Sequence, residues 1–505
     1  MYDRRRELLP VMPDEFFAPV FDNKTPPTYR YFDGEHWCES EGRKTTPLIS
    51  PVDGTVVAHT QVVTEKEIDA VLNHAVVSQS GWENTALNKR VSIMHLAADW
   101  IRHFQEYLTV LMTREIGKTH DEAKGEIVRT ADLIDYYAQE AQSIRGETLD
   151  SDNFPGFEKG KIAMVEHVAH GVVLAIAPFN YPVNLSASKI APALLMGNSV
   201  VLKPPTLGAL SALHLVRIFE KAGVPRGVLT AVTGVGNDIG NYIVSHPNVS
   251  MVAFTGSSDT GIAIAGKAAM KPLLFECGGN NPAIVLPDAD MHTTAREIVK
   301  GAFQYSGQRC TGIKYVLTMS NIKDQLLPLI KETMNEMVKP GDPRSPETKL
   351  VGPVISEDAA IHIEEVVNEA ISQGATLVVG GKRTKALMQP TILTGVKPTM
   401  RVIAKETFGP VMSFVDVASI DEAIDIINSS QYGLQASVFT RDEGSGIVVA
   451  QQLNVGTVQI NGSPQRGPDH FPFLGVKHSG VGVQGVRYSL EAMSRVKSVV
   501  LNKPQ

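Results

Sequence analysis

The sequence has little cysteine, no long hydrophobic run and no strong net charge of either sign. Only three cysteines occur among 505 residues, Cys38, Cys277 and Cys310, and their spacing fits neither a disulfide framework nor a zinc site. The longest apolar runs, such as 171–178, are far shorter than the roughly 20 residues that span a bilayer. The net charge of -7 gives no overall electrostatic attraction to nucleic acid or to an anionic membrane. We expect no metal, no nucleic-acid or membrane partner, and at least one free thiol.

The N-terminus also lacks the features of a secretory signal. Residues 1–17 mix three arginines with acidic residues, and no apolar segment follows them. Hydrophobic residues make up 43% and charged residues 20% of the chain, which is the composition of an ordinary globular protein. A chain of 505 residues is too long for a single core, because domains average roughly 150 residues. We therefore expect several domains and a cytosolic location.

Hydrophobic periodicity predicts different structures along the chain. Residues 64–145 carry apolar side chains at helical spacing, which predicts a block of helices. Beyond residue 160, short apolar strands alternate with amphipathic helices. This alternation predicts an α/β fold with a parallel, doubly wound sheet covered on both faces. The predicted strands are 172–177, 199–202, 228–232, 250–254 and 273–275, and the predicted helices are 186–195, 207–222, 238–245 and 260–269.

A second series of strands and helices runs from residue 283 to about 460 and predicts a second α/β domain. It contains a predicted long helix at 293–305. Its strands are expected near Val316, Leu377, Met412 and Val458. The segments 161–168 and 496–502 are strand-like, lie outside both sheets and could pair as an edge. Residues 1 to about 60 are rich in proline and turn residues, so only an arm with short strands is expected there.

Three residues stand where a side chain could do chemistry. Cys310 follows a predicted helix, so a turn presents its thiol, although a buried structural cysteine would look the same. Glu276 ends an apolar strand and precedes two glycines, where α/β sheets place functional groups; a solvated strand-end carboxylate is the alternative. Asn180 lies between two prolines after the first strand. Its amide can donate two hydrogen bonds, but it could also be an ordinary turn residue.

A fourth feature is the loop that contains Gly256 and Ser257, between a predicted strand and a predicted helix. Its backbone amides and the helix dipole suit a phosphate. The loop lacks the full G-x-G-x-x-G pattern, so it is weak evidence alone.

Taken together, and in their order along the chain, the four features resemble the aldehyde dehydrogenase superfamily. The match runs from about residue 45 to the C-terminus and includes Lys203-Pro204-Pro205-Thr206, Glu406-Thr407-Phe408-Gly409-Pro410, Pro472-Phe473 and Lys477-His478-Ser479-Gly480.

The resemblance implies a role for each catalytic candidate. Cys310 matches the family nucleophile, and Glu276 matches the general base. Asn180 matches the side chain that forms the oxyanion hole together with the Cys310 backbone N–H. A thiolate adds to an aldehyde, fixed donors stabilise the oxyanion, and a carboxylate takes a proton from the water that hydrolyses the thioester.

The resemblance also implies a dinucleotide cofactor. Lys203 matches the residue that holds the adenosine ribose, and Glu406 matches the acceptor for the nicotinamide ribose hydroxyls. The implied cofactor-binding residues are Lys203, Thr206, Gly256, Ser257, Glu406 and Phe408. NAD-preferring relatives often carry Glu where Thr206 stands, and that carboxylate would repel a 2′-phosphate. Thr206 can instead donate to the phosphate and Lys203 can pair with it, which predicts NADP.

The segment 465–473, Gln-Arg-Gly-Pro-Asp-His-Phe-Pro-Phe, resembles the non-phosphorylating glyceraldehyde-3-phosphate dehydrogenases. Residues matching the substrate site of that subfamily are Arg129, Tyr181, Arg309 and Arg466. Three guanidiniums and a phenol suit a phosphorylated aldehyde, because the Arg fork binds phosphate oxygens in pairs. Arg129 alone could equally lie on a solvated helix face. The resemblance implies irreversible oxidation of glyceraldehyde 3-phosphate to 3-phosphoglycerate, with water hydrolysing the thioester.

Two alternatives stay open from the sequence. The arginines could hold the carboxylate of another small aldehyde, such as succinate semialdehyde. The chain could also be a catalytically silent scaffold, although the presence of Cys310, Glu276 and Asn180 argues against this. Two departures from the family pattern, Asn280 in place of Lys and Lys405 in place of an acidic residue, leave room for an altered cofactor geometry or aldehyde preference.

The resemblance implies three structural parts. Residues 1–145 and 168–280 would form a Rossmann-type cofactor-binding domain, and residues 281–477 the catalytic domain. Residues 146–167 and 478–505 would form a small β oligomerisation arm. Such an arm pairs with a neighbouring subunit, so a homodimer or a homotetramer is expected.

Overall fold

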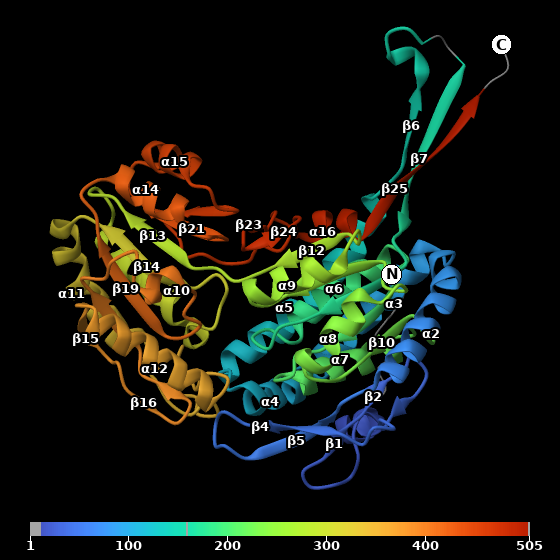
Figure 1. Cartoon of the computed structure of the whole chain (residues 1–505), viewed down its shortest axis with the longest axis horizontal. Coiled ribbons are helices and arrows are strands. Elements are labelled where there is room, and N and C mark those ends of the chain that lie inside the picture. The colour runs from blue at the N-terminus through green and yellow to red at the C-terminus, as the bar shows by residue number, and fades with distance from the viewer. Residues whose placement is uncertain (1–11, 158–159, 503–505) are drawn as a thin grey trace.

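The computed structural model describes residues 12–157 and 160–502, which form two α/β lobes and a projecting β-arm (Figure 1). The parts of the predicted domains at 1–11, 158–159 and 503–505 lie outside the described residues. Within the described ranges, no helix is both long and apolar enough to cross a membrane.

The first lobe is built on an eight-stranded sheet with a parallel centre. Its parallel strands are β8 (Val172–Ile176), β9 (Ser199–Lys203), β10 (Leu229–Ala231), β11 (Met251–Thr255) and β12 (Leu273–Glu276), in the order β10-β9-β8-β11-β12. Each strand lies within one residue of its predicted bounds. The predicted doubly wound α/β fold is confirmed. At the edges, β24 (Gly480–Val481) pairs with β12, while β2 (Tyr31–Phe32) and β3 (Trp37–Cys38) follow β10.

Helices cover both faces of this sheet. In β8, Val173 and Ala175 pack toward one face, and Val172 and Leu174 toward the other, as the two-residue period of a strand requires. The first face is covered by α3 (Leu87–His103), α4 (Gln105–Ile116), α5 (His120–Glu140), α6 (Asn184–Leu195) and α7 (Ala209–Lys221). The second is covered by α2 (Glu65–Glu83), α8 (Gly236–Ser245) and α9 (Ser258–Ala268). Helices α2 to α5 confirm the predicted block at 64–145.

The strand order places the functional candidates of the first lobe together. The chain runs outward from β8 through β9 to β10 and then returns to β11 on the other side of β8. In open α/β sheets, ligands bind at such a reversal, beyond the carboxyl ends of the strands. Lys203 and Glu276 are the last residues of β9 and β12, and Asn180 and Gly256 lie in the segments that follow β8 and β11.

The second lobe is built on a seven-stranded sheet that is parallel except for β15 at one edge. Its order is β15 (Thr376–Val379), β18 (Thr391–Thr394), β19 (Val411–Asp416), β14 (Ile313–Thr318), β13 (Asn281–Val285), β21 (Gln435–Phe439) and β22 (Thr457–Ile460). The strands expected near Val316, Leu377, Met412 and Val458 are confirmed. One face packs on α10 (Met291–Phe303) and α11 (Ser320–Met337), the other on α12 (Glu357–Ser372), α14 (Ile420–Ser429) and α15 (Glu443–Gln452).

The arm is an antiparallel sheet of β6 (Glu147–Asp150), β7 (Lys161–Ala169) and β25 (Ser494–Asn502), in the order β25-β7-β6. The expected pairing of the two strand-like segments is therefore confirmed. Residues 480–492 lie elsewhere, because β24 joins the first sheet and α16 (Val486–Ala492) packs on α5 and α6. The division of the chain into domains stays a prediction.

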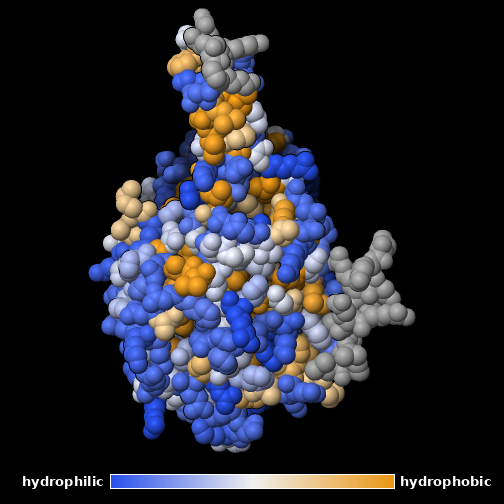
Figure 2. Space-filling model, turned by 90° about the vertical axis from the view of Figure 1, so that its right-hand side faces the viewer, coloured by the Kyte–Doolittle hydropathy of each residue, from blue (hydrophilic) through white to orange (hydrophobic). Residues whose placement is uncertain are grey.

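Apolar side chains of the arm are exposed. They are Leu149, Met164, Val496, Val499, Val500 and Leu501. Figure 2 shows hydrophobic surface along the projecting arm, which extends away from both lobes (Figure 1).

The N-terminal segment packs against the first lobe. Helix α1 (Pro13–Phe17) inserts Phe16 and Phe17 against Trp100 and Phe104. Strands β1 (Thr28–Tyr29), β5 (Val56–Gln61) and β4 (Thr45–Ile49) form a small sheet, so the expected short strands are present. The remaining short elements are β16 (Arg383–Thr384), β17 (Leu387–Met388), β20 (Tyr432–Gly433), β23 (Val476–Lys477), α13 (Arg401–Ala404) and the 3-10 turns at 18–20, 141–143, 151–153 and 304–307.

Candidate active site

A strained turn presents Cys310. Helix α10 ends at Phe303, two residues before its predicted end, because Tyr305 and Ser306 adopt left-handed backbone angles with φ of 51° and 54°. Gly307 continues this turn with φ of 67°. A Cβ atom at Gly307 would lie 2.1 Å from the carbonyl oxygen of Gly409, so only glycine fits there.

Amides and an ammonium group from both lobes hold this turn. Asn180 Nδ2, from the first lobe, donates to the Gln308 carbonyl at 2.9 Å. From the second lobe, Asn281 Nδ2 donates to the Cys310 carbonyl at 2.7 Å, and Lys314 Nζ donates to the Gly307 carbonyl at 2.5 Å. A side-chain amide has two N–H groups, and the bond to Gln308 uses only one of those of Asn180. Asn180 thus lies beside the thiol-bearing loop with donor capacity for a ligand oxygen.

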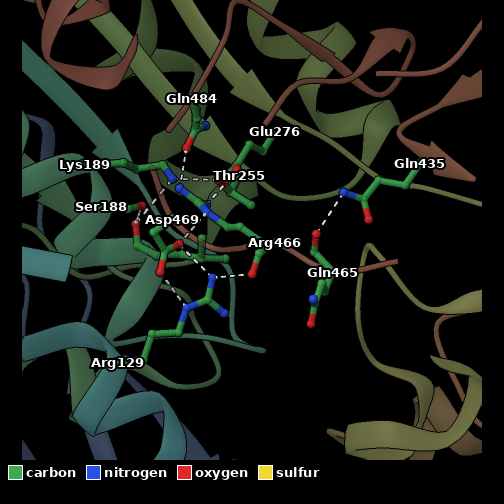
Figure 3. A network of polar contacts seen from close by, with 11 residues as sticks. Arg129, Ser188, Lys189, Thr255, Glu276, Gln435, Gln465, Arg466, Asp469 and Gln484 are labelled. Carbon is green, nitrogen blue, oxygen red and sulfur yellow. Dashed lines mark hydrogen bonds and ion pairs between the residues drawn. The ribbon is translucent and has the colours of Figure 1, made fainter. Parts of the chain in front are cut away.

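Glu276 is buried at the end of β12, with 3% of its surface exposed. Its Oε2 accepts a hydrogen bond from Thr255 Oγ1 at 2.9 Å, and Thr255 Oγ1 accepts one from Lys189 Nζ at 2.6 Å. Its Oε1 accepts from Arg466 Nη1 at 2.7 Å. Burial lowers the pKa of Lys189 to about 8, against the opposing effect of the Glu276 carboxylate. Figure 3 shows Glu276 held between the Arg466 guanidinium and the Thr255 hydroxyl.

The Cys310 thiol is part-buried and lies in the field of two carboxylates. Burial, followed by the negative charges of Glu276 and Glu406, raises the pKa of Cys310 to about 12. Arg309 and Arg466 act in the opposite direction. All three cysteines are free, which includes the expected free thiol. In this state Cys310 is a neutral thiol at neutral pH.

The predicted substrate arginines on α5 and in the 461–475 loop lie together. Arg129 Nε and Nη2 each donate to one oxygen of Asp469 at 2.7 Å. Arg129 Nη2 also donates to the Arg466 carbonyl at 2.5 Å. A guanidinium nitrogen of Arg466, Nε, lies 3.7 Å from Asp469 Oδ1. Figure 3 shows Asp469 between the two arginines, so they form one continuous network with Glu276.

Arg309 and Tyr181 have different partners. Arg309 is 7% exposed, and its guanidinium donates to the neutral oxygens of Gln304, Thr311 and Pro464. The Lys118 Nζ lies 3.5 Å from the centroid of the Tyr181 ring. Lys118 is itself paired with Glu126 at 2.6 Å. Tyr181 thus lies beside the buried Lys118–Glu126 pair.

Four of the predicted cofactor residues lie at or just beyond the carboxyl ends of β9 and β11. Lys203 is 7% exposed and donates from Nζ to the Pro204 carbonyl at 3.1 Å. Burial lowers its pKa to about 8, so a nearby anion would favour its charged form. Thr206 follows in the same loop and is half-buried. Gly256 and Ser257 connect β11 to α9, and Ser257 caps this helix by accepting from the Thr260 N–H at 3.3 Å.

Glu406 and Phe408 of the second lobe contact the segments that follow β12 and β8 of the first. Glu406 Oε1 accepts from the Gly279 N–H at 3.1 Å, and burial raises the Glu406 pKa, with Lys314 opposing. Phe408 packs edge-on against Phe179 with ring centroids 5.8 Å apart.

The surroundings of Gly278, which lies against Glu406, indicate whether a dinucleotide fits. A Cβ atom on Gly278 would lie 2.3 Å from Glu406 Oε2 and 3.3 Å from the Ser258 hydroxyl. The buried Ser258 hydroxyl has no hydrogen-bond partner among the described residues. A close backbone approach, an acceptor carboxylate and an unpaired hydroxyl therefore converge there. These features fit the hydroxyl-bearing part of a dinucleotide.

Sequence reasoning missed four polar residues of this site: Lys189, Thr255, Asp469 and Gln484. A signal existed for Lys189, because a lysine within a helix whose residues are all buried needs a polar partner. Gln484 accepts from Arg466 Nη2 at 3.0 Å, and nothing in its local sequence indicates this.

The two departures from the family pattern differ in their surroundings. Asn280 is 3% exposed and donates from Nδ2 to the Ile403 carbonyl, while its Oδ1 has no partner among the described residues. Lys405 is exposed at the end of α13. Asn280 therefore lies beside the segment that leads to Glu406, whereas the Lys405 side chain faces solvent.

Comparison with known proteins agrees with this geometry. Residues 37–499 match the model of the aldehyde dehydrogenase family. An NADP-dependent glyceraldehyde-3-phosphate dehydrogenase from Triticum aestivum is 43% identical over 97% of this chain and 97% of its own. A 3-sulfolactaldehyde dehydrogenase from Priestia aryabhattai is 37% identical over 85% of this chain and 90% of its own. The crystal structure of NADP-dependent glyceraldehyde-3-phosphate dehydrogenase from Bacillus halodurans C-125, complexed with NADP, has a TM-score of 0.92 and 44% identity, covering 94% of this chain and 99% of that one. The chain belongs to the aldehyde dehydrogenase family.

Proposed function

We propose that this protein oxidises glyceraldehyde 3-phosphate to 3-phosphoglycerate with NADP, through a thioester on Cys310 that water hydrolyses. One observation carries the choice of substrate: the guanidinium of Arg466 lies between Glu276 and Asp469 and is tied through Asp469 to Arg129. In this proposal, the two arginines bind the anionic group of the substrate next to the buried carboxylate. Arginine forks suit phosphate oxygens.

In this proposal, the Cys310 thiol loses its proton to water, the resulting thiolate attacks the aldehyde carbon, and the carbonyl oxygen becomes an oxyanion. The free N–H of Asn180 and the Cys310 backbone N–H stabilise that charge, and each such donor can contribute about 3 kcal/mol in a dry site. NADP, when bound, supplies the acceptor for the hydride. Glu276 then takes a proton from the water that attacks the thioester.

Lys189 and Thr255 position the base. The Thr255 hydroxyl donates to Glu276 Oε2 and accepts from Lys189 Nζ, so the carboxylate is fixed from one side. Its second oxygen, Oε1, is the one that Arg466 reaches. Because the site is buried, each of these bonds orients the carboxylate more strongly than it would in water.

NADP is favoured by the loop after β9. A carboxylate at position 206 would repel a 2′-phosphate, and Thr206 has none. Lys203 is close in the same loop and can pair with the phosphate. The wheat relative and the Bacillus halodurans structure are both named as NADP-dependent enzymes, which supports the same cofactor here.

A sulfonated aldehyde is the second candidate substrate, because the 37% identical Priestia aryabhattai relative is named for 3-sulfolactaldehyde. A sulfonate carries one negative charge and a phosphate monoester nearly two at neutral pH.

The chain should be assayed with NADP or NAD on glyceraldehyde 3-phosphate, 3-sulfolactaldehyde, succinate semialdehyde and glyceraldehyde. Highest kcat/KM for glyceraldehyde 3-phosphate, with 3-phosphoglycerate formed without added inorganic phosphate, supports the proposal. A better sulfonated or carboxylated substrate contradicts it.

The active form is proposed to be a homodimer or homotetramer that pairs through the arm. Exposed Val499, Val500 and Leu501 on β25 would lose their contact with water in such an assembly. A charged substitution such as Val500→Asp should yield a smaller particle in analytical ultracentrifugation than the unchanged chain. A cytosolic location remains the expectation from the sequence.

A further inference from the structure

The guanidinium of Arg466 has two roles in the proposed reaction. It is the closest cationic partner of the general base, with Nη1 2.7 Å from Glu276 Oε1. It is also one of the arginines proposed to bind the substrate phosphate. Its remaining contacts are Gln484 Oε1, which accepts from Nη2 at 3.0 Å, and Asp469 Oδ1, 3.7 Å from Nε. With its side chain only 12% exposed, Arg466 has little water to replace these partners.

Both oxygens of Glu276 are engaged in this state. Oε2 accepts from the Thr255 hydroxyl and Oε1 from Arg466. Each oxygen keeps a second acceptor site that a water could reach. The ion pair with Arg466 nevertheless stabilises the ionised carboxylate, so proton transfer from water to Oε1 becomes more favourable when the guanidinium withdraws or turns.

The charges around the site favour such a withdrawal when an anion arrives. The cationic side chains of the network outnumber its carboxylates by one; they are Lys189, Arg129 and Arg466, against Glu276 and Asp469. A phosphate monoester carries between one and a half and two negative charges at neutral pH. A bound phosphate would more than offset this excess and offer Arg466 a stronger anionic partner than a shared carboxylate.

We propose that Arg466 holds Glu276 in an inactive ion pair until the phosphate of the substrate takes over its guanidinium, so that anion binding releases the general base. This inference rests on the proposed function. The released Glu276 Oε1 takes a proton from water as the water oxygen forms a bond to the thioester carbon. The carbon–sulfur bond then breaks, and the electron pair leaves with the Cys310 sulfur. Water is the only reactant that this step consumes besides the thioester.

A substrate divided into two pieces tests this coupling. Glyceraldehyde has no phosphate, and the phosphite dianion supplies the missing charge and tetrahedral shape. Enzyme with bound NADP is loaded with glyceraldehyde, and the decay of the Cys310 thioester is followed by rapid quenching and mass spectrometry at increasing phosphite. We expect saturable acceleration of thioester hydrolysis by roughly tenfold, the size of one exchanged charge-assisted hydrogen bond.

Two variants separate the release of the base from simple anion binding. Arg466→Gln removes the guanidinium that pairs with Glu276, so without phosphite its thioester should already decay at the rate that saturating phosphite gives the unchanged enzyme, and phosphite should not raise it further. Arg466→Lys keeps a charge without the fork and covers the case in which the glutamine variant folds poorly. Arg309→Lys is the matched control, because Arg309 contacts Gln304, Thr311 and Pro464 rather than Glu276. It should need more phosphite yet reach the same maximal acceleration.

Several results would overturn the proposal. Thioester decay that is independent of phosphite in the unchanged enzyme would do so, whether or not phosphite competes with glyceraldehyde 3-phosphate. Equal acceleration in Arg466→Gln and the unchanged enzyme would show that the ion pair does not control the base. The proposed function is judged separately, by oxidation of glyceraldehyde 3-phosphate itself, so a failure of either one is recognised without the other.

Discussion

Arg129 donates two hydrogen bonds to Asp469, one to each carboxylate oxygen, at 2.7 Å. The two residues are 340 positions apart in the chain, so this pair fastens helix α5 to the loop that carries Arg466. Asp469 also lies between two guanidiniums and reduces the repulsion between them.

Asp469→Asn should therefore destabilise the protein. It would remove the charge that separates Arg129 from Arg466, at a cost of about 1 kcal/mol after allowance for the part-exposed Arg129. The unfolding temperature, measured by circular dichroism, should fall, and added phosphite should restore part of the loss. Asp132→Asn is the matched control, because Asp132 is 64% exposed in a surface pair with Arg102. Equal effects in the two variants would remove the special role of Asp469.

The second prediction concerns the reactivity of Cys310. Its pKa of about 12 means that the thiolate fraction of the cofactor-free enzyme keeps rising with pH across the accessible range. Alkylation of Cys310 by iodoacetamide, followed by peptide mapping, should accelerate by roughly tenfold per pH unit from pH 7 to 10. Because the Glu276 charge raises this pKa, Glu276→Gln should lower it and speed alkylation at pH 8. A plateau near pH 7 would contradict the part-buried, neutral thiol.

Glu276→Gln should also separate the two halves of the reaction. The amide keeps the shape of the side chain but cannot take a proton from water, so the thioester on Cys310 should form and then persist. Stopped-flow absorbance should show a burst of NADPH followed by a slow steady state. Cys310→Ala should give neither phase, whereas Cys38→Ala, which changes a distant free thiol, should behave like the unchanged enzyme. Absence of a burst would assign Glu276 another role.

The loop after β9 gives a prediction on the cofactor. Thr206→Glu would place a carboxylate where the 2′-phosphate is proposed to bind, and repulsion should shift preference from NADP toward NAD. The ratio of kcat/KM values for the two cofactors measures this shift. Thr206→Gln is the matched control, since it has the same length without the charge. Equal or better efficiency of the unchanged enzyme with NAD would exclude the assignment.

The sequence predicts the scaffold of this protein well, for a physical reason. The parallel strands of the first lobe are continuous apolar runs bounded by glycine, proline and polar residues, so their limits follow from local chemistry. Because the carboxyl ends of such strands share one edge, the positions of Asn180, Lys203, Gly256 and Glu276 could be predicted together.

The contacts inside the site could not be predicted in this way. The bond between Arg129 and Asp469 depends on how the loop after β22 folds back onto α5, and neither residue signals the other. The left-handed angles of Tyr305 and Ser306 are also imposed from outside, because the turn is fixed by distant partners such as Gly409. Helical periodicity alone therefore extended α10 two residues too far.

The last prediction concerns Arg466 and compares two aldehydes. Charge-assisted hydrogen bonds to one buried guanidinium contribute ~1.5 to 3 kcal/mol, so Arg466→Ala should lower kcat/KM for glyceraldehyde 3-phosphate by roughly 10 to 150-fold. Unphosphorylated glyceraldehyde makes no such contact, and its kcat/KM should change little, because this ratio reports the steps before thioester hydrolysis. Misfolding or a damaged thiol would depress both values alike. If both aldehydes lose efficiency equally, Arg466 serves only to hold Glu276 and its loop, and the phosphate site must lie elsewhere.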